Sequence, residues 1–339
     1  MTEVPAGVIW SLLAGVVNGS FATPTKYTSR WRWENIWAVW AVTALLVVPW
    51  VAALATVPRL AVFYRETNPG LLFLLLSLGL GVGVSQIFFG LALAEVGLSI
   101  GFAVTIGLST AIGSIVPLLM LDPHVLMTHK GLMVLLGVGL MLAGTALCGV
   151  SSNRRDRGKN GSALPARKGS GFGRGLVLCV LAGALSPLMN VALAYGAPMI
   201  QRAAEVGIPP AGRTNVVWPL VLTATLVPYL VYCIYLCRKN RSWQLYAAPG
   251  TVHYWVLGAV MGILWTGSVI LYGYSSTRLG YLGPVLGWPL FMSVIIVTSN
   301  LWGIVTGEWK GTAAATLGAM LAGVLLLMLG FCTVAVTSA

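Results

Sequence analysis

Long apolar stretches separated by short polar connections make up most of the chain. Ten of these stretches are long enough to cross the hydrocarbon core of a bilayer as a helix, which takes about 20 residues. A backbone in lipid must satisfy its own hydrogen bonds, and continuous apolar runs favour helices over barrel strands. The pattern therefore predicts an all-α polytopic membrane protein with ten transmembrane helices. The predicted spans are approximately 5–23, 33–57, 70–94, 97–121, 130–151, 174–196, 214–237, 252–275, 281–306 and 311–337.

One polar segment, residues 152–173, divides this pattern near the middle. It is rich in Gly, Ser and basic residues, a composition typical of a flexible linker. Five predicted spans precede it (1–151) and five follow it (174–339), so the two halves enter the membrane from opposite sides. The spans 97–121 and 281–306 occupy corresponding places and are both rich in helix breakers. Such a pair predicts interrupted helices in two inverted five-helix repeats, although small residues also simply let helices approach closely.

Composition and charge narrow the class of protein. The chain has 339 residues, of which 58% are hydrophobic and 8% charged, too few charges for the surface of a soluble domain. The net charge of +12 does not indicate nucleic-acid binding, because the basic residues lie in the connections between spans. Fourteen of the 20 Lys and Arg residues lie in the odd-numbered connections, so we expect a cytoplasmic linker and both termini outside.

Several motifs resemble those of a known transporter family. Residues 31–37 read WRWENIW, residues 97–101 read GLSIG, and Gly307-Glu308-Trp309 follows the ninth span. Together with Leu264-Trp265 and Trp288 they resemble bacterial L-rhamnose–proton symporters of the drug/metabolite transporter superfamily, from the first span to the tenth. The resemblance implies two inverted five-helix repeats around a central cavity lined mainly by the first, third, fourth, sixth, eighth and ninth spans. It also implies proton-driven import of L-rhamnose or a related small neutral sugar across the bacterial inner membrane.

The chain departs from the family pattern where polar residues are expected. Ser11, Pro284 and Phe291 stand at positions where the family carries groups that titrate or bind a sugar. We therefore predict that proton coupling is weak or absent, which leaves another ion or uncoupled transport open. The alternative function is a carrier of the same superfamily for a more amphipathic metabolite or drug. No metal cluster, cofactor motif or nucleophile with its base is evident, so an enzyme is not predicted.

Sugar binding inside a membrane protein calls for uncharged hydrogen-bonding groups and flat aromatic faces. The predicted cavity spans offer both kinds of group, and the alternative for each polar one is a bond between helices worth about 0.6 kcal/mol. Glu34 is predicted to be structural, and Trp40 and Trp309 are predicted to lie at the membrane interface. The predicted substrate-binding residues are Asn18, Gln86, Thr105, Ser109, Asn190, Trp265, Ser268, Tyr272 and Trp288.

The predicted topology can be tested by cysteine labelling in intact cells. Ser162→Cys, in the linker, should be protected from a membrane-impermeant thiol reagent, whereas Thr2→Cys should react. The unmodified chain, whose five cysteines all lie in predicted spans, provides the background. Labelling of Ser162→Cys with protection of Thr2→Cys would show that the orientation is reversed.

Overall fold

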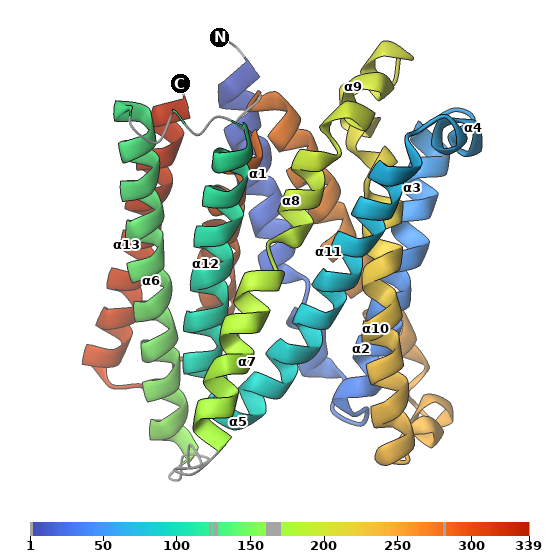
Figure 1. Ribbon diagram of the computed structural model, residues 1–339. Coiled ribbons are helices and arrows are strands. Elements are labelled where there is room, and N and C mark those ends of the chain that lie inside the picture. The colour runs from blue at the N-terminus through green and yellow to red at the C-terminus, as the bar shows by residue number, and fades with distance from the viewer. Residues whose placement is uncertain (1–2, 122–123, 125–127, 161–170, 281–282, 339) are drawn as a thin grey trace.

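The structure is a computed structural model that describes residues 3–121, 124, 128–160, 171–280 and 283–338. Thr2, Ser162 and most of the predicted linker lie outside these residues. Within them every regular element is a helix, and none is a strand (Figure 1). Eight helices are long and apolar enough to cross a membrane, and Val104–Leu119 and Ala314–Gly330 are shorter apolar helices. The prediction of an all-α polytopic membrane protein is confirmed.

The first half of the chain forms spans of unequal regularity. The elements α2, η2 and α3 form one span. This span is irregular in the middle because Pro49 has no N–H to donate to the carbonyl of Leu45, and a π-helical turn precedes it. The elements of this half are α1 (Glu3–Ser20), η1 (Thr23–Tyr27), α2 (Trp33–Val42), η2 (Thr43–Val47), α3 (Val48–Thr56), α4 (Leu60–Arg65), α5 (Pro69–Leu121) and α6 (His129–Asn160).

Helix α5 contains two of the predicted spans. It is 53 residues long, and Figure 1 shows that it reverses direction between two arms. The first arm contains the apolar stretch Pro69–Ala92 and the second contains Val104–Leu119. The predicted spans 70–94 and 97–121 are therefore the two arms of one bent helix.

In the second half the helix break differs from the prediction. Helix α12 is continuous although Pro289 lies inside it, as bilayer helices can tolerate. The sixth span is the interrupted one, because Ser186 and Pro187 separate α7 from α8. The elements of this half are α7 (Gly171–Leu185), α8 (Leu188–Tyr195), α9 (Ala197–Glu205), η4 (Pro210–Val216), α10 (Trp218–Lys239), η5 (Trp243–Ala247), α11 (Val252–Arg278), α12 (Gly283–Val305) and α13 (Ala314–Ser338).

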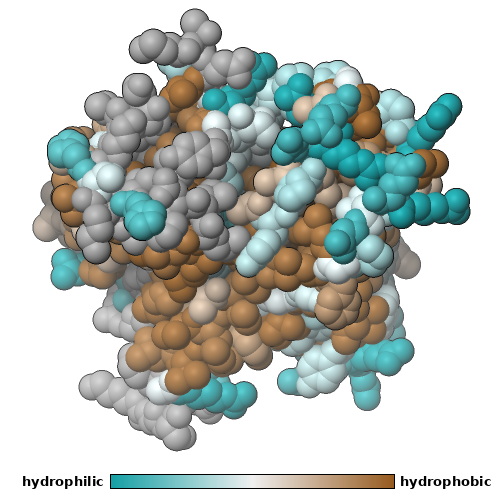
Figure 2. All heavy atoms as spheres, turned by 45° about the horizontal axis from the view of Figure 1, so that its top comes forward, coloured by the Kyte–Doolittle hydropathy of each residue, from teal (hydrophilic) through white to brown (hydrophobic). Residues whose placement is uncertain are grey.

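The bundle has two distinct ends. Helix α1 begins and α13 ends at one end, where α4 and α9 also lie, and we call this end the termini side (Figure 1). Helix α6 ends and α7 begins at the opposite end, the linker side. Figure 2 shows a continuous apolar area across the middle of the visible face, with hydrophilic residues gathered above and below it. Exposed apolar side chains such as Phe73 and Leu54 are those expected of a lipid-facing surface.

Glycines allow α10 to pack closely against the first arm of α5. A Cβ atom on Gly79 would lie 2.2 Å from the carbonyl oxygen of Val221, and one on Gly83 would lie 2.4 Å from that of Thr225. The hydroxyl of Thr225 in turn donates to the carbonyl of Gly79 at 2.9 Å. Small residues that permit such contacts are a main source of helix association in lipid.

This contact yields a prediction with a control in the same helix. Gly79→Ala should lower the melting temperature of the detergent-purified protein by several degrees, because the new methyl group meets a backbone oxygen. Gly90→Ala should leave it unchanged or raise it, because no atom lies within 4 Å of a Cβ there and Ala favours a helix by about 1 kcal/mol. Equal melting temperatures for both variants would contradict the close packing of α5 and α10.

Candidate functional site

The amide of Asn190 lies at the centre of a buried network on α8. Its Nδ2 donates to the carbonyl oxygens of Gly113 at 2.7 Å and Pro284 at 2.9 Å, and its Oδ1 accepts from the hydroxyl of Tyr272. Asn190 and Tyr272 are both 0% exposed. The single amide thereby joins the second arm of α5, α8, α11 and α12.

Aromatic rings pack around this amide. Tyr272 stacks on Phe291 with ring centroids 5.0 Å apart, and the edge of Trp288 meets it at 5.7 Å. The indole N–H of Trp288 donates to the carbonyl oxygen of Ser109 at 3.1 Å. A Cβ on Gly113 would lie 2.3 Å from that indole nitrogen, so the glycine is needed for the ring to fit.

Helix α1 closes the same layer. The hydroxyl of Ser275 donates to the carbonyl oxygen of Gly7 at 2.7 Å and lies 3.0 Å from the hydroxyl of Ser11. All these side chains are buried, and the layer lies toward the termini side of the bundle. We call this layer the termini-side seal and define it by Ser11, Asn190, Tyr272, Ser275, Trp288 and Phe291.

A second group of predicted site residues lies below the seal. Asn18 Nδ2 donates to the hydroxyl of Ser268 at 2.7 Å, and that hydroxyl donates to the carbonyl of Trp265 at 2.6 Å. The indole of Trp265 meets that of Trp40 edge to face at 5.4 Å. Trp265 is only half-buried, although Ser268 on the same helical face is fully buried. Its ring is therefore partly accessible.

Gln86 shows the same property on α5. It lies on the helical face of Leu75 and Val82, which are buried, yet Gln86 itself is half-buried. Its amide has no hydrogen-bond partner among the described residues. Thr105 is separate from both groups, because its hydroxyl bonds to the carbonyl of Cys179 on α7 at 3.3 Å. Of the nine predicted residues, Asn190, Tyr272 and Trp288 belong to the seal, and the carbonyl of Ser109 accepts the indole N–H of Trp288. Asn18, Trp265 and Ser268 form the second group, and Gln86 and Thr105 stand apart.

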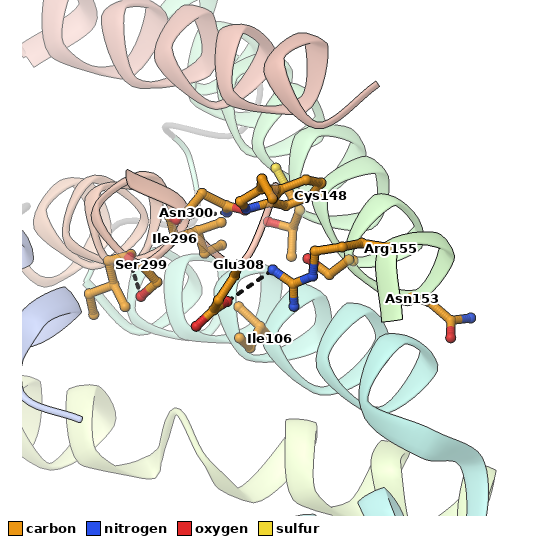
Figure 3. Close-up of a pocket in the computed structure, with 13 residues that line it drawn as sticks. Ile106, Cys148, Asn153, Arg155, Ile296, Ser299, Asn300 and Glu308 are labelled. Carbon is orange, nitrogen blue, oxygen red and sulfur yellow. Dashed lines mark hydrogen bonds and ion pairs between the residues drawn. The ribbon is translucent and has the colours of Figure 1, made fainter. Parts of the chain in front are cut away.

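The internal face of α12 becomes more exposed toward the linker side. Trp288 and Phe291 are 1% exposed, Ile295 is half-buried and Ser299 is exposed. Ile295 and Ser299 line a pocket of about 350 Å³ between α5, α6 and α12, shown in Figure 3. The linker side of the bundle thus contains a pocket below the seal. The rest of the lining is Ile106, Thr145, Cys148, Gly149, Ser152, Asn153, Arg155, Ile296, Asn300, Glu308 and Trp309.

An ion network forms the rim of this pocket. Glu308 pairs with Lys26 of η1 and, at 3.0 Å, with Arg155 of α6, whose guanidinium lies 4.8 Å from the ring centre of Trp309. Partial burial raises the pKa of Glu308, but the bond and charge of Lys26 and the charge of Arg155 outweigh it, so the pKa lies below its ordinary value. The carboxylate is therefore charged at neutral pH, and the network ties three distant segments together.

Two sequence predictions for these residues were wrong, and the contacts of a third residue agree with its predicted role. Trp40 and Trp309 are 5% and 6% exposed, so they pack inside the protein and not at the membrane interface. Glu34 accepts bonds from Asn240 Nδ2 at 2.9 Å and from the hydroxyl of Ser242 at 2.7 Å, in keeping with a structural role. No sequence pattern indicated that Glu308 pairs with Arg155, although the motif at 307–309 had drawn attention to this segment.

The family of this chain follows from comparison with known proteins. The model of the L-rhamnose-proton symport protein family matches residues 2–339. The chain belongs to this family. The L-rhamnose-proton symporter of Cronobacter sakazakii is 27% identical over 316 residues, which cover 91% of this chain and 90% of the relative. That of Shigella sonnei is 25% identical over 318 residues and covers 91% of each chain, and that of Escherichia coli is 25% identical over 316 residues, 91% of this chain and 90% of the relative.

Membership in the L-rhamnose-proton symport protein family makes this chain a transporter and not an enzyme. The three positions predicted from the sequence to depart from the family pattern lie close together in the structure. Ser11 and Phe291 belong to the termini-side seal, and Pro284 supplies a carbonyl to it. The departures therefore lie at one layer of the bundle.

The seal can be tested through its central amide. Asn190→Leu should lower the melting temperature markedly, because two carbonyls and a hydroxyl lose their partner at about 1–3 kcal/mol per buried group. Tyr272→Phe should cost less, because it leaves only one oxygen unpaired. Ser109→Ala is the control, since the Ser109 hydroxyl has no partner among the described residues and its loss should not destabilise the protein. A variant Asn190→Leu as stable as Ser109→Ala would contradict the network.

Proposed function

We propose that this protein imports L-rhamnose or a closely related neutral sugar across the bacterial inner membrane by alternating access. The observation that carries the proposal is the family match over nearly the entire chain, together with relatives named as L-rhamnose-proton symporters. The uncharged amides and indole rings on the internal face suit a hydroxylated solute with an apolar side. The alternative of a more amphipathic cargo is not favoured by the match.

The proposed architecture is a ten-helix bundle of two inverted repeats. Its support is the pattern of neighbouring helices. Helix α6 packs on α13, and α2 packs on α10, as equivalent spans of two repeats would. The contact of α1 with α11 is repeated by that of α7 with α5, and the contact of α10 with α5 is repeated by that of α2 with α11. Exchange of the two halves thus preserves the contacts.

We propose that the linker side faces the cytoplasm. The excess of Lys and Arg in the connections at that side supports this orientation. The structure then corresponds to a state closed to the outside and hollow toward the cytoplasm. Opening to the outside would require the Asn190 amide to part from at least one of its partners.

The proposed sugar site lies below the seal, between Gln86 of α5 and Trp265 of α11. Gln86 offers an unpaired amide, and Trp265 offers a partly accessible ring to the C–H face of a sugar. Asn18 and Ser268, already bonded to each other, would hold the backbone around Trp265 or exchange partners with a sugar hydroxyl. Asn190, Tyr272 and Trp288 would act as the gate above the sugar.

The coupling ion is the finer part of the proposal. The family and the relatives are named for proton symport, whereas Ser11, Pro284 and Phe291 carry no titrating group. The prediction of weak proton coupling therefore remains a prediction. A coupling group needs a proton affinity that changes with substrate binding, and a carboxylate is the usual group. Among the described acids, Glu95 is partly buried at the bend of α5.

Uptake by proteoliposomes tests the function and the coupling together. Purified protein should take up L-rhamnose, and Gln86→Leu should weaken its affinity by about tenfold, which corresponds to about 1.4 kcal/mol for a lost polar contact. Gly90→Ala is the control, because it changes the same helix without adding a contact. Absence of uptake under any gradient would contradict the proposed function.

An imposed pH gradient should give little accumulation of L-rhamnose in the proteoliposomes. Concentrative uptake that a protonophore abolishes would show that proton coupling is strong.

A further inference from the structure

A second pocket lies on the other face of the termini-side seal. It has a volume of about 330 Å³ and is bounded by α8, α9, η4, α11 and the start of α12. Pro284 lines it, and the carbonyl of Pro284 accepts the amide of Asn190. The pocket therefore adjoins the seal through Pro284. Its lining is Leu193, Ala194, Ala197, Ile200, Gln201, Ala204, Arg213, Ser276, Thr277, Gly280 and Pro284.

Arg213 places a positive charge in this pocket, and no acidic residue among those described lines the pocket to pair with it. Its Nε donates to the carbonyl of Ile208 at 3.0 Å, and its terminal N–H groups have no partner among the described residues. The side chain is half-buried, and none of the lining residues is acidic. Arg202, on the same side of the bundle, differs because it pairs with Glu66. The terminal nitrogens of Arg213 are therefore available to a ligand, and a guanidinium binds two oxygens at once.

Ser276 adds a second available group. The residue is 4% exposed, and its hydroxyl makes no hydrogen bond to any group that the structure describes. Because Ser276 lines the pocket, this hydroxyl is available to a ligand that enters it. Leu193, Ala194 and Pro284 supply apolar surface opposite these polar groups. Convergent polar groups on an apolar wall are typical of a small-molecule site.

We propose that this pocket is an entry subsite that binds the sugar on the termini side before the seal opens. The inference rests on the proposed function. The Arg213 guanidinium binds two adjacent ring hydroxyls, Ser276 binds a third, and the apolar wall takes the C–H face. A sugar held there lies directly above Asn190 and Pro284, so parting of the seal would pass it toward Gln86 and Trp265.

Protection of a cysteine by L-rhamnose tests the subsite in reconstituted full-length protein. In a Cys332→Ser background, Thr277→Cys places a thiol in the pocket, and Val206→Cys places one on the same side but outside the lining. L-Rhamnose should slow labelling of Thr277→Cys by an impermeant thiol reagent at least about fivefold and leave Val206→Cys unchanged. Adding Arg213→Gln should raise the concentration of L-rhamnose that gives half of the maximal protection about tenfold, as expected for loss of a bidentate contact.

A variant in the proposed central site separates the two sugar sites. Protection of Thr277→Cys should persist when Gln86→Leu is added, because that change lies below the seal. Ser276→Ala, which removes only a hydroxyl, should weaken protection even if Arg213→Gln fails to fold. Three results would overturn the subsite. They are no protection of Thr277→Cys by L-rhamnose, loss of that protection when Gln86→Leu is added, and protection that neither Arg213→Gln nor Ser276→Ala weakens. The proposed function is tested separately, by uptake of L-rhamnose by the unmodified protein. If uptake occurs, that function stands even when the subsite is overturned, and if uptake is absent, that function is overturned.

Discussion

The structure depends on the requirement that every polar group inside a bilayer must find a partner within the protein. The Asn190 amide is the hydrogen-bond partner of three polar groups at once. These are two carbonyls and a hydroxyl, which lie on three different elements. Water cannot replace any of these bonds while the layer is closed. The four helices that meet at Asn190 are therefore held in one arrangement, and another arrangement needs new partners for all four groups.

The two sides of the bundle are closed by different kinds of contact. The termini side is closed by buried neutral bonds and stacked rings, whereas the linker side carries partly exposed ion pairs such as Lys26–Glu308. Exposed ion pairs contribute about 0–1 kcal/mol, because water solvates the charges when they separate. Buried bonds without water are far more costly to break. A bound sugar that offers hydroxyls to the seal would lower that cost, and this links substrate binding to opening.

The sequence predicted the elements better than the contacts between them. Hydropathy placed the span 252–275 close to the observed α11, because lipid imposes a length on each helix. It did not show that 97–121 is the second arm of a bent helix, or that Pro187 and not Pro289 interrupts a helix. Tyr272 and Asn190 were both predicted as site residues, but their bond spans 82 positions in the chain. Residue type predicts that such groups are buried, while only packing shows whether they face each other or a solute.

The neutral character of the seal also restricts how protons can act on transport. Among the acids whose side chains the structure describes, Glu66 and Glu205 lie at the surface of the termini side, where Glu66 pairs with Arg202 and Glu205 accepts from Gln201. Glu34, Glu95 and Glu308 all lie toward the linker side. A change of pH within the ordinary range therefore leaves the charge of the seal itself unaltered. Any proton that drives this carrier must therefore act on a group outside the seal and reach the seal through the packing of α5, α11 and α12.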